Sequence, residues 1–95
     1  MYIDMEIKIA DVVISLNGRD NGKCFIVTGK DDNYSFLVDG KGRKLEKPKR
    51  KKNKHIKPEG ICDARLAEKL IGGEKVTNSE IRRALAEYAT TKGDV

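Results

Sequence analysis

A chain of 95 residues, 38% of them hydrophobic and 37% charged, can form one modest core and has little room for a second. It contains no continuous apolar segment long enough to span a membrane, and it does not begin with the basic and apolar regions of a signal peptide, so we expect a cytoplasmic protein. The formal net charge of +5 makes the distribution of the 20 Lys and Arg residues the main clue to a partner.

The first half of the chain predicts short β-strands separated by turns. Residues 1–8 alternate between apolar and charged side chains, which is typical of a short strand or an extended lead-in. Three segments rich in β-branched and aromatic residues follow, at 11–16, 23–29 and 34–39. The Asn, Asp and Gly residues between them predict tight turns, because these residues tolerate positive φ. We expect Tyr34, Phe36 and Val38 to share one face of the third strand. Tyr34 and Phe36 could offer a platform for stacking bases, but on an alternating strand we expect them to lie in the core.

Regularly spaced short strands predict a small antiparallel sheet that could close into a barrel. Closure needs one or two further strands, and the candidates are residues 43–45 and residues 55–57. A short Lys-rich closing strand would also protect the edge of the sheet from pairing with another chain.

The second half of the chain predicts two helices. A break is expected at Pro58-Glu59-Gly60, after which apolar residues from 61 to 71 recur with a helical period and end at Gly72-Gly73. The second helix begins with a capping box, in which Thr77 is the N-cap and Glu80 reaches back to it. We therefore divide the chain into residues 1–58 and a C-terminal helical extension, residues 59–95. Such short helices are marginal alone and must pack on the barrel, on each other or on a partner.

Residues 41–57 form a concentrated basic segment. They include ten of the twenty Lys and Arg residues, one acid (Glu46) and the only His, so their net charge is +9 and the other 78 residues carry net −4. Clustered cations raise the local potential and release counterions when they bind phosphates. The alternative is a solvated loop that maintains solubility, but a run of nearly one sign favours a polyanionic partner. Pro48 and Pro58 limit helix formation, and we expect the segment to stay mobile until phosphate orders it.

Residues 11–29 resemble a KOW motif. Its elements are a hydrophobic strand at 12–14, Gly18, Arg19, the Gly22-Lys23 step and a hydrophobic return strand at 26–27. The continuation, in which Val38-Asp39-Gly40 leads into the basic segment, is similar to KOW-type large-subunit ribosomal proteins of the archaeal and eukaryotic kind.

The resemblance covers about residues 9–58 and implies an SH3-like barrel that binds ribosomal RNA or joins a ribonucleoprotein. The predicted fold is therefore α+β, mainly β: a small SH3-like antiparallel β-barrel followed by a C-terminal α-helical hairpin. The same family includes transcription elongation factors that use the domain partly to contact proteins. The alternative to RNA binding is thus a protein–protein adaptor that docks on the translation or transcription machinery, with the helices as one candidate contact surface.

The candidate RNA-binding residues are cations that can donate charge-assisted hydrogen bonds to phosphate oxygens. Two flank the glycine-containing loop, and its glycines need serve only the turn. His55 can stack on a base or donate to phosphate, although a His between Lys residues is more often simply polar surface. The full set is Arg19, Lys23, Lys41, Arg43, Lys44, Lys47, Lys49, Arg50, Lys51, Lys52, Lys54, His55 and Lys57.

The sequence gives no sign of an enzyme. It has no Ser/His/Asp set, no carboxylate pair with an evident pocket and no GxxxxGK[ST] phosphate loop. In the expected cytoplasmic setting Cys24 and Cys62 are reduced thiols; they form no CxxC pair, and one His cannot complete a usual zinc ligand set. We expect neither a metal nor a cofactor.

Overall fold

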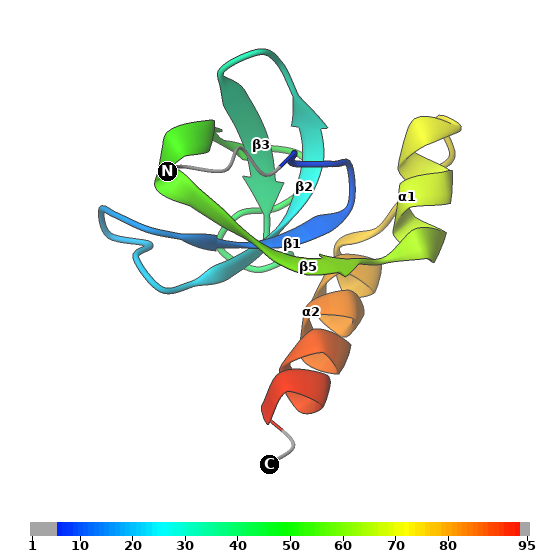
Figure 1. Ribbon diagram of the computed structural model, residues 1–95. Coiled ribbons are helices and arrows are strands. Elements are labelled where there is room, and N and C mark those ends of the chain that lie inside the picture. The colour runs from blue at the N-terminus through cyan, green and yellow to red at the C-terminus, as the bar shows by residue number, and fades with distance from the viewer. Residues whose placement is uncertain (1–5, 94–95) are drawn as a thin grey trace.

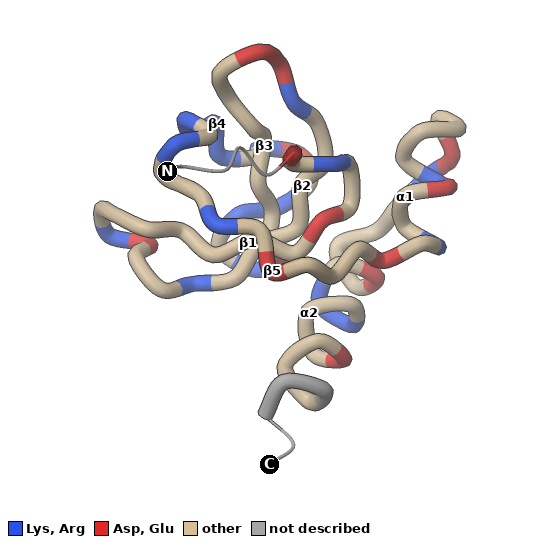
Figure 2. Tube along the Cα trace, in the orientation of Figure 1, with Lys and Arg blue, Asp and Glu red and all other residues tan. Residues whose placement is uncertain are grey.

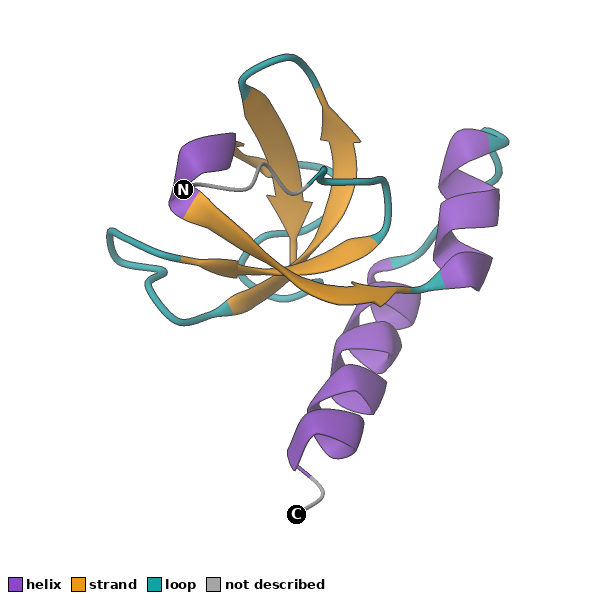
Figure 3. Ribbon diagram, in the orientation of Figure 1, coloured by secondary structure: helices purple, strands orange, loops and turns teal. Residues whose placement is uncertain are grey.

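A computed structural model describes residues 6–93 and the side chains of residues 6–90, as an antiparallel sheet with two α-helices beside it (Figure 1, Figure 3). The strands are β1 (Asp11–Ser15), β2 (Cys24–Lys30), β3 (Tyr34–Val38), β4 (Lys49–Lys52) and β5 (Ile56–Cys62). A 3-10 turn, η1 (Asn53–His55), joins β4 to β5, and the helices are α1 (Ala64–Ile71) and α2 (Asn78–Gly93). The predicted α+β, mainly β class is confirmed.

The first three predicted strands are present within one residue of their expected bounds, but the basic segment differs from its prediction. Residues 43–45 are a bend and a turn without strand structure, so the strand considered there is wrong. Part of the segment expected to be mobile instead forms β4, which pairs with β3. The closing strand predicted at 55–57 exists as β5, but it runs on to Cys62. Residues 6–8 have no regular structure, and residues 1–5 of the predicted lead-in lie outside the described residues.

The sheet is strongly curled. Its strand order is β4-β3-β2-β1-β5, so β4 and β5 are opposite edges although they follow one another in the chain. In a flat sheet the two edges would be about 19 Å apart. The chain from Lys52 to Ile56 reaches at most about 14 Å, so the edges must approach at this corner. Accordingly, the Leu16 N–H after β1 donates to the His55 carbonyl at 2.9 Å. The edges do not pair with each other, so the sheet is open and not a closed barrel.

Both faces of the central strands are buried, which explains their nearly continuous apolar sequences. The inner face of the curl holds one cluster, made of Ile7, Val13, Phe25, Val27, Leu37 and Ile56. The outer face holds a second cluster, in which Ala10, Val12, Ile26 and Val38 pack against Leu66, Ile81, Ala84 and Tyr88 of the helices. Adjacent residues such as Val12 and Val13 therefore point into different cores, as the alternation of a strand requires.

The prediction that Tyr34 and Phe36 lie in the core is wrong. Both are only partly buried, whereas Ser35 and Leu37 on the opposite face are fully buried. Val38 shares the outer face with Tyr34 and Phe36 and is fully buried, in the cluster that the helices complete. The helices thus cover the end of β3 and leave its beginning exposed. The buried Ser35 hydroxyl is satisfied by Asn53, at 2.6 Å between the two side-chain oxygens.

Each helix begins at a residue whose side chain caps it with a hydrogen bond. The Asp63 carboxylate caps α1 by accepting the Leu66 N–H at 3.0 Å; the helix starts later than expected because β5 continues past Pro58 and Gly60. The boundary drawn between residues 58 and 59 consequently falls inside a strand. The capping box of α2 is confirmed: the Glu80 N–H donates to Thr77 Oγ1 at 3.1 Å, and the Thr77 N–H donates to Glu80 Oε1 at 2.9 Å.

The two helices pack on the sheet and meet each other mainly near their connection. An ion pair joins Lys69 of α1 to Glu80 of α2 at 2.6 Å, while α2 then runs away from α1 along the outer face (Figure 1). Neither helix has the length and apolar character needed to cross a membrane.

Removal of a side chain between α2 and the sheet should destabilise the whole domain. Ile81 is fully buried in the outer cluster, and we expect Ile81→Ala to lower the free energy of unfolding by about 2–4 kcal/mol. Ile71→Ala is the matched control, since that side chain is 73% exposed and its loss should change stability by less than about 0.5 kcal/mol. Urea unfolding followed by circular dichroism measures both; equal effects would show that α2 does not contribute to the core.

Candidate nucleic-acid interface

The segment that resembles a KOW motif is the β1–β2 hairpin and its loop. Gly18 and Gly22 have φ of 74° and 88°, and a Cβ built on Gly22 would meet nothing within 4 Å. Glycine is therefore needed at these two positions for its backbone conformation, as we expected from the sequence. The Gly22 N–H donates to the Ser15 carbonyl at 2.7 Å, which closes the loop.

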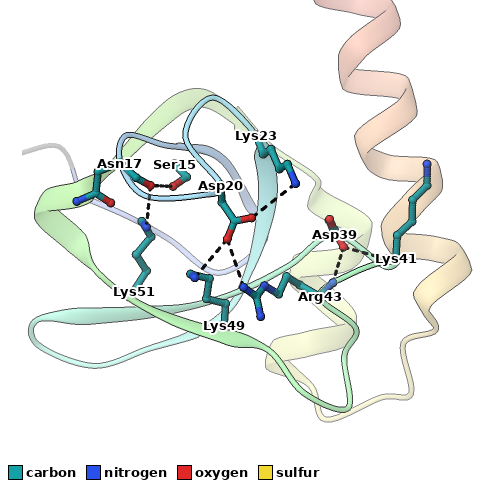
Figure 4. Close-up of polar contacts among 9 residues, drawn as sticks. All are labelled: Ser15, Asn17, Asp20, Lys23, Asp39, Lys41, Arg43, Lys49 and Lys51. Carbon is teal, nitrogen blue, oxygen red and sulfur yellow. Dashed lines mark hydrogen bonds and ion pairs between the residues drawn. The ribbon is translucent and has the colours of Figure 1, made fainter.

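Asp20, at the tip of this loop, joins three separate segments of the chain (Figure 4). Its carboxylate, with a side chain only 10% exposed, lies 3.3 Å from Lys49 Nζ, 3.5 Å from Arg43 Nη2 and 3.7 Å from Lys23 Nζ. Burial alone would raise the pKa of this carboxyl group. The hydrogen bond from Lys49 and the charges of Lys49, Arg43 and Lys23 outweigh burial and hold the pKa below its ordinary value. The β1–β2 loop and the basic segment therefore lie side by side.

The loop between β3 and β4, residues 39–48, is anchored at its start by its own carboxylate and by α2. Asp39 Oδ1 accepts the N–H groups of Lys41 and Arg43 at 2.9 and 2.8 Å. Arg82 Nη1 donates to the Gly40 carbonyl at 2.7 Å. Gly40 has φ of 79°, and a Cβ there would lie 2.6 Å from the Asn78 carbonyl oxygen, so no other residue fits without displacing α2.

The first residue of α2 anchors the middle of the same loop. Asn78 Oδ1 accepts the Leu45 N–H at 2.8 Å, and Asn78 Nδ2 donates to Glu46 Oε1 at 2.9 Å. This side-chain hydrogen bond, followed by one from the backbone of Glu46 itself, lowers the pKa of the Glu46 carboxyl group. The only acid in the basic segment is thus held by the helix.

We call the β1–β2 loop, the β3–β4 loop and the start of β4, which meet at Asp20, the loop face. Its cations come from the β1–β2 loop, the β3–β4 loop and the start of β4: Arg19, Lys23, Lys41, Arg43, Lys44, Lys47 and Lys49. Its three carboxylates, Asp20, Asp39 and Glu46, are all engaged by the protein's own donors. Lys41, Lys44 and Lys47 are exposed and have no ion-pair partner among the described residues. The loop face therefore keeps an excess of positive charge.

The cations of β4 alternate between two faces of the strand. Lys49 and Lys51 lie opposite Leu37 and Ser35 of β3 and point toward the β1–β2 loop. Lys51, a predicted RNA-binding residue, is only 9% exposed, and its Nζ donates to the Asn17 carbonyl at 3.3 Å, so it holds the β1–β2 loop to β4. Arg50 and Lys52 lie on the other face, which is open to solvent.

Three of the remaining predicted residues, Lys52, Lys54 and Lys57, border a second surface, the corner groove. It lies between the β2–β3 turn and the η1–β5 corner, with a volume of about 970 Å³. Lys52, Lys54 and Lys57 line it and are exposed, whereas His55 is partly buried. Figure 2 shows Lys and Arg on β4, at the start of β5 and in the β1–β2 loop, on the side of the sheet away from α1.

The sequence interpretation missed the residues that position these cations. Asp20 stands between the two loop glycines, where it was counted only as a turn residue. Asn78 and Arg82 belong to a helix whose contact with the basic segment has no local signal. Among residues 6–93, no group of three or more His, Cys, Asp or Glu side chains is placed to hold a metal ion. No protein-family model matches the chain, and no curated protein matches it either.

Asp20→Asn should remove the pH-dependent stabilisation that the Asp20 carboxylate gives to the loop face. Because the folded-state pKa of Asp20 is depressed, its stabilisation is complete above the unfolded pKa of about 3.9 and is lost as pH falls through the folded pKa. We expect Asp20→Asn to lower the free energy of unfolding by about 1–2 kcal/mol at neutral pH, and this deficit to shrink as pH falls below about 4.

Urea unfolding at a series of pH values measures the difference. Asp32→Asn is the control, because Asp32 is exposed and its carboxylate makes no ion pair among the described residues. A deficit that stays constant with pH would contradict the role given to the Asp20 charge.

Proposed function

We propose that the protein binds RNA through the loop face, mainly by its phosphates. The observation that carries the proposal is the meeting of Lys23, Arg43 and Lys49 at Asp20, which brings the β1–β2 loop and the basic segment together. The same two loops carry four further exposed cations, Arg19, Lys41, Lys44 and Lys47. Clustered cations of this kind take up phosphate oxygens through charge-assisted hydrogen bonds and release counterions. Such contacts position a polynucleotide but read little of its base sequence.

The fold is consistent with a KOW domain of SH3-like architecture, which we include in the proposal. Five strands in the order β4-β3-β2-β1-β5, with β5 returning to pair with β1, curl toward a small barrel. The KOW-like residues 11–29 form the hairpin that carries Arg19 and Lys23 to the loop face. The resemblance also makes ribosomal RNA the first RNA class to test, by crosslinking in cells and sequencing of the bound RNA.

The loop face is built before a ligand arrives. Asp20 fixes the β1–β2 loop, while Asn78 and Arg82 fix the loop of residues 39–48. A ligand that binds preformed loops spends less of its interaction energy on ordering them. This arrangement supports tight binding despite the small number of side chains involved.

The helices expose less apolar surface to a protein partner than their sequence pattern indicated. Their apolar residues Leu66, Ile81 and Tyr88 are buried against the sheet of the same chain. Among their large hydrophobic side chains, the one that is strongly exposed within the described residues is Ile71. We therefore place RNA binding ahead of an adaptor function.

The affinity for single-stranded RNA should fall steeply with salt. If about six phosphates are neutralised, the slope of log K against log salt concentration should be about −4. Filter binding or fluorescence anisotropy in increasing KCl measures this slope. A slope near zero would contradict binding through phosphates.

Replacing exposed cations of the loop face should weaken all RNAs about equally. We expect the double variant Lys44→Gln and Lys47→Gln to reduce affinity and to make the salt slope shallower by about 1.5. The matched control is Arg65→Gln with Lys75→Gln, which removes two exposed cations from the helical side of the molecule. Equal losses in the two double variants would indicate net charge alone, without a specific loop face.

A further inference from the structure

A partly exposed aromatic ring and an arginine form a stacked pair on the open face of β3 and β4. The guanidinium carbon of Arg50 lies 3.6 Å from the centroid of the Tyr34 ring. Arg50 is exposed and Tyr34 is partly buried, on the part of the outer face that the helices leave uncovered. The register places Arg50 opposite Phe36 and Lys52 opposite Tyr34, so one face presents planar and cationic groups side by side.

Tyr34 is also one of the residues that line the corner groove, together with Lys52, Lys54 and Lys57, whereas Arg50 lies outside this lining. The Tyr34–Arg50 pair therefore stands at the rim of the groove. Three carboxylates, Glu6, Asp31 and Asp32, line the groove beside four lysines, Lys30, Lys52, Lys54 and Lys57, so the lining keeps a net charge of +1 (4 − 3). Asp31 accepts the N–H groups of Asn33 and Tyr34 at 3.1 and 2.9 Å and so stabilises its own turn, and Lys57 lies 3.8 Å from Glu59. A volume of about 970 Å³ is at the upper end of the range of about 300–1,000 Å³ for small-molecule sites. The groove can therefore admit a flat ring with a charged substituent.

From these contacts we propose that the corner groove takes an unpaired base of a single-stranded polynucleotide. The base stacks on the Tyr34–Arg50 pair, and Lys52, Lys54 and Lys57 hold the flanking phosphates. Aromatic rings and guanidinium planes are the groups on which unpaired bases stack in RNA-binding proteins. This inference rests on the proposed RNA binding and adds a preference for unpaired over duplex strands.

Strand β4 connects this site to the loop face. From Lys49 at the loop face to Lys52 at the corner groove the strand rises about 10 Å. A single strand that follows β4 contacts both surfaces, with its phosphates held at the loop face and a base inserted at the groove. A rigid duplex cannot place a base there without opening a pair.

The test compares three fluorescent polynucleotides by anisotropy: a single strand of about 12 nucleotides, an abasic sugar–phosphate chain of the same length, and the corresponding duplex. The unmodified protein should bind the base-bearing single strand about 5- to 100-fold more tightly than the abasic chain. Tyr34→Leu and Arg50→Lys should each remove most of this difference without changing affinity for the abasic chain. Tyr34→Phe keeps the ring and should retain the difference.

Each outcome decides the inference. If the protein binds the abasic chain or the duplex as tightly as the single strand, base stacking is refuted while phosphate binding by the loop face stands. If none of the three binds, the proposed function fails as well. Circular dichroism checks that each variant is folded; should Tyr34→Leu be unfolded, Arg50→Lys, which retains the charge and loses the plane, decides instead.

Discussion

The short connection between β4 and β5 is the constraint on which the rest of the structure depends. Three residues, Asn53–His55, join strands at opposite edges of the sheet, so the sheet must curl until those edges meet at one corner. Curling encloses one apolar cluster and leaves a second apolar face outside. A chain of this size has too little sheet to cover that outer face, and α1 and α2 supply the cover.

Charge is arranged around the same corner. On β4, the side chains that point inward are bound to the protein, Lys49 by Asp20 and Lys51 by the Asn17 carbonyl, while Arg50 and Lys52 point outward. One face of β4 thus binds the β1–β2 loop, and the other face exposes its cations to solvent. An edge strand rich in lysine is also protected against pairing with another chain.

The sequence predicted what depends on local pattern and missed what depends on distant contacts. Alternation and turn residues located β1, β2 and β3, and the spacing of Thr77 and Glu80 located the start of α2. No apolar period marks Lys49–Lys52, because its inward lysines are satisfied by residues elsewhere in the chain. Tyr34 and Phe36 were assigned to the core because alternation along a strand shows which residues share a face. It cannot show which part of that face the helices cover.

The contacts of Gly40, Leu45 and Glu46 with Asn78 and Arg82 have a consequence for engineering. Residues 39–48 cannot be grafted onto another small barrel as an independent peptide, because Asn78 and Arg82 of α2 hold part of their conformation. A transplant would have to include the loop, that helix and the sheet face on which the helix packs. Chimeras that received the lysines alone would have the positive charge but not the conformation of the loop.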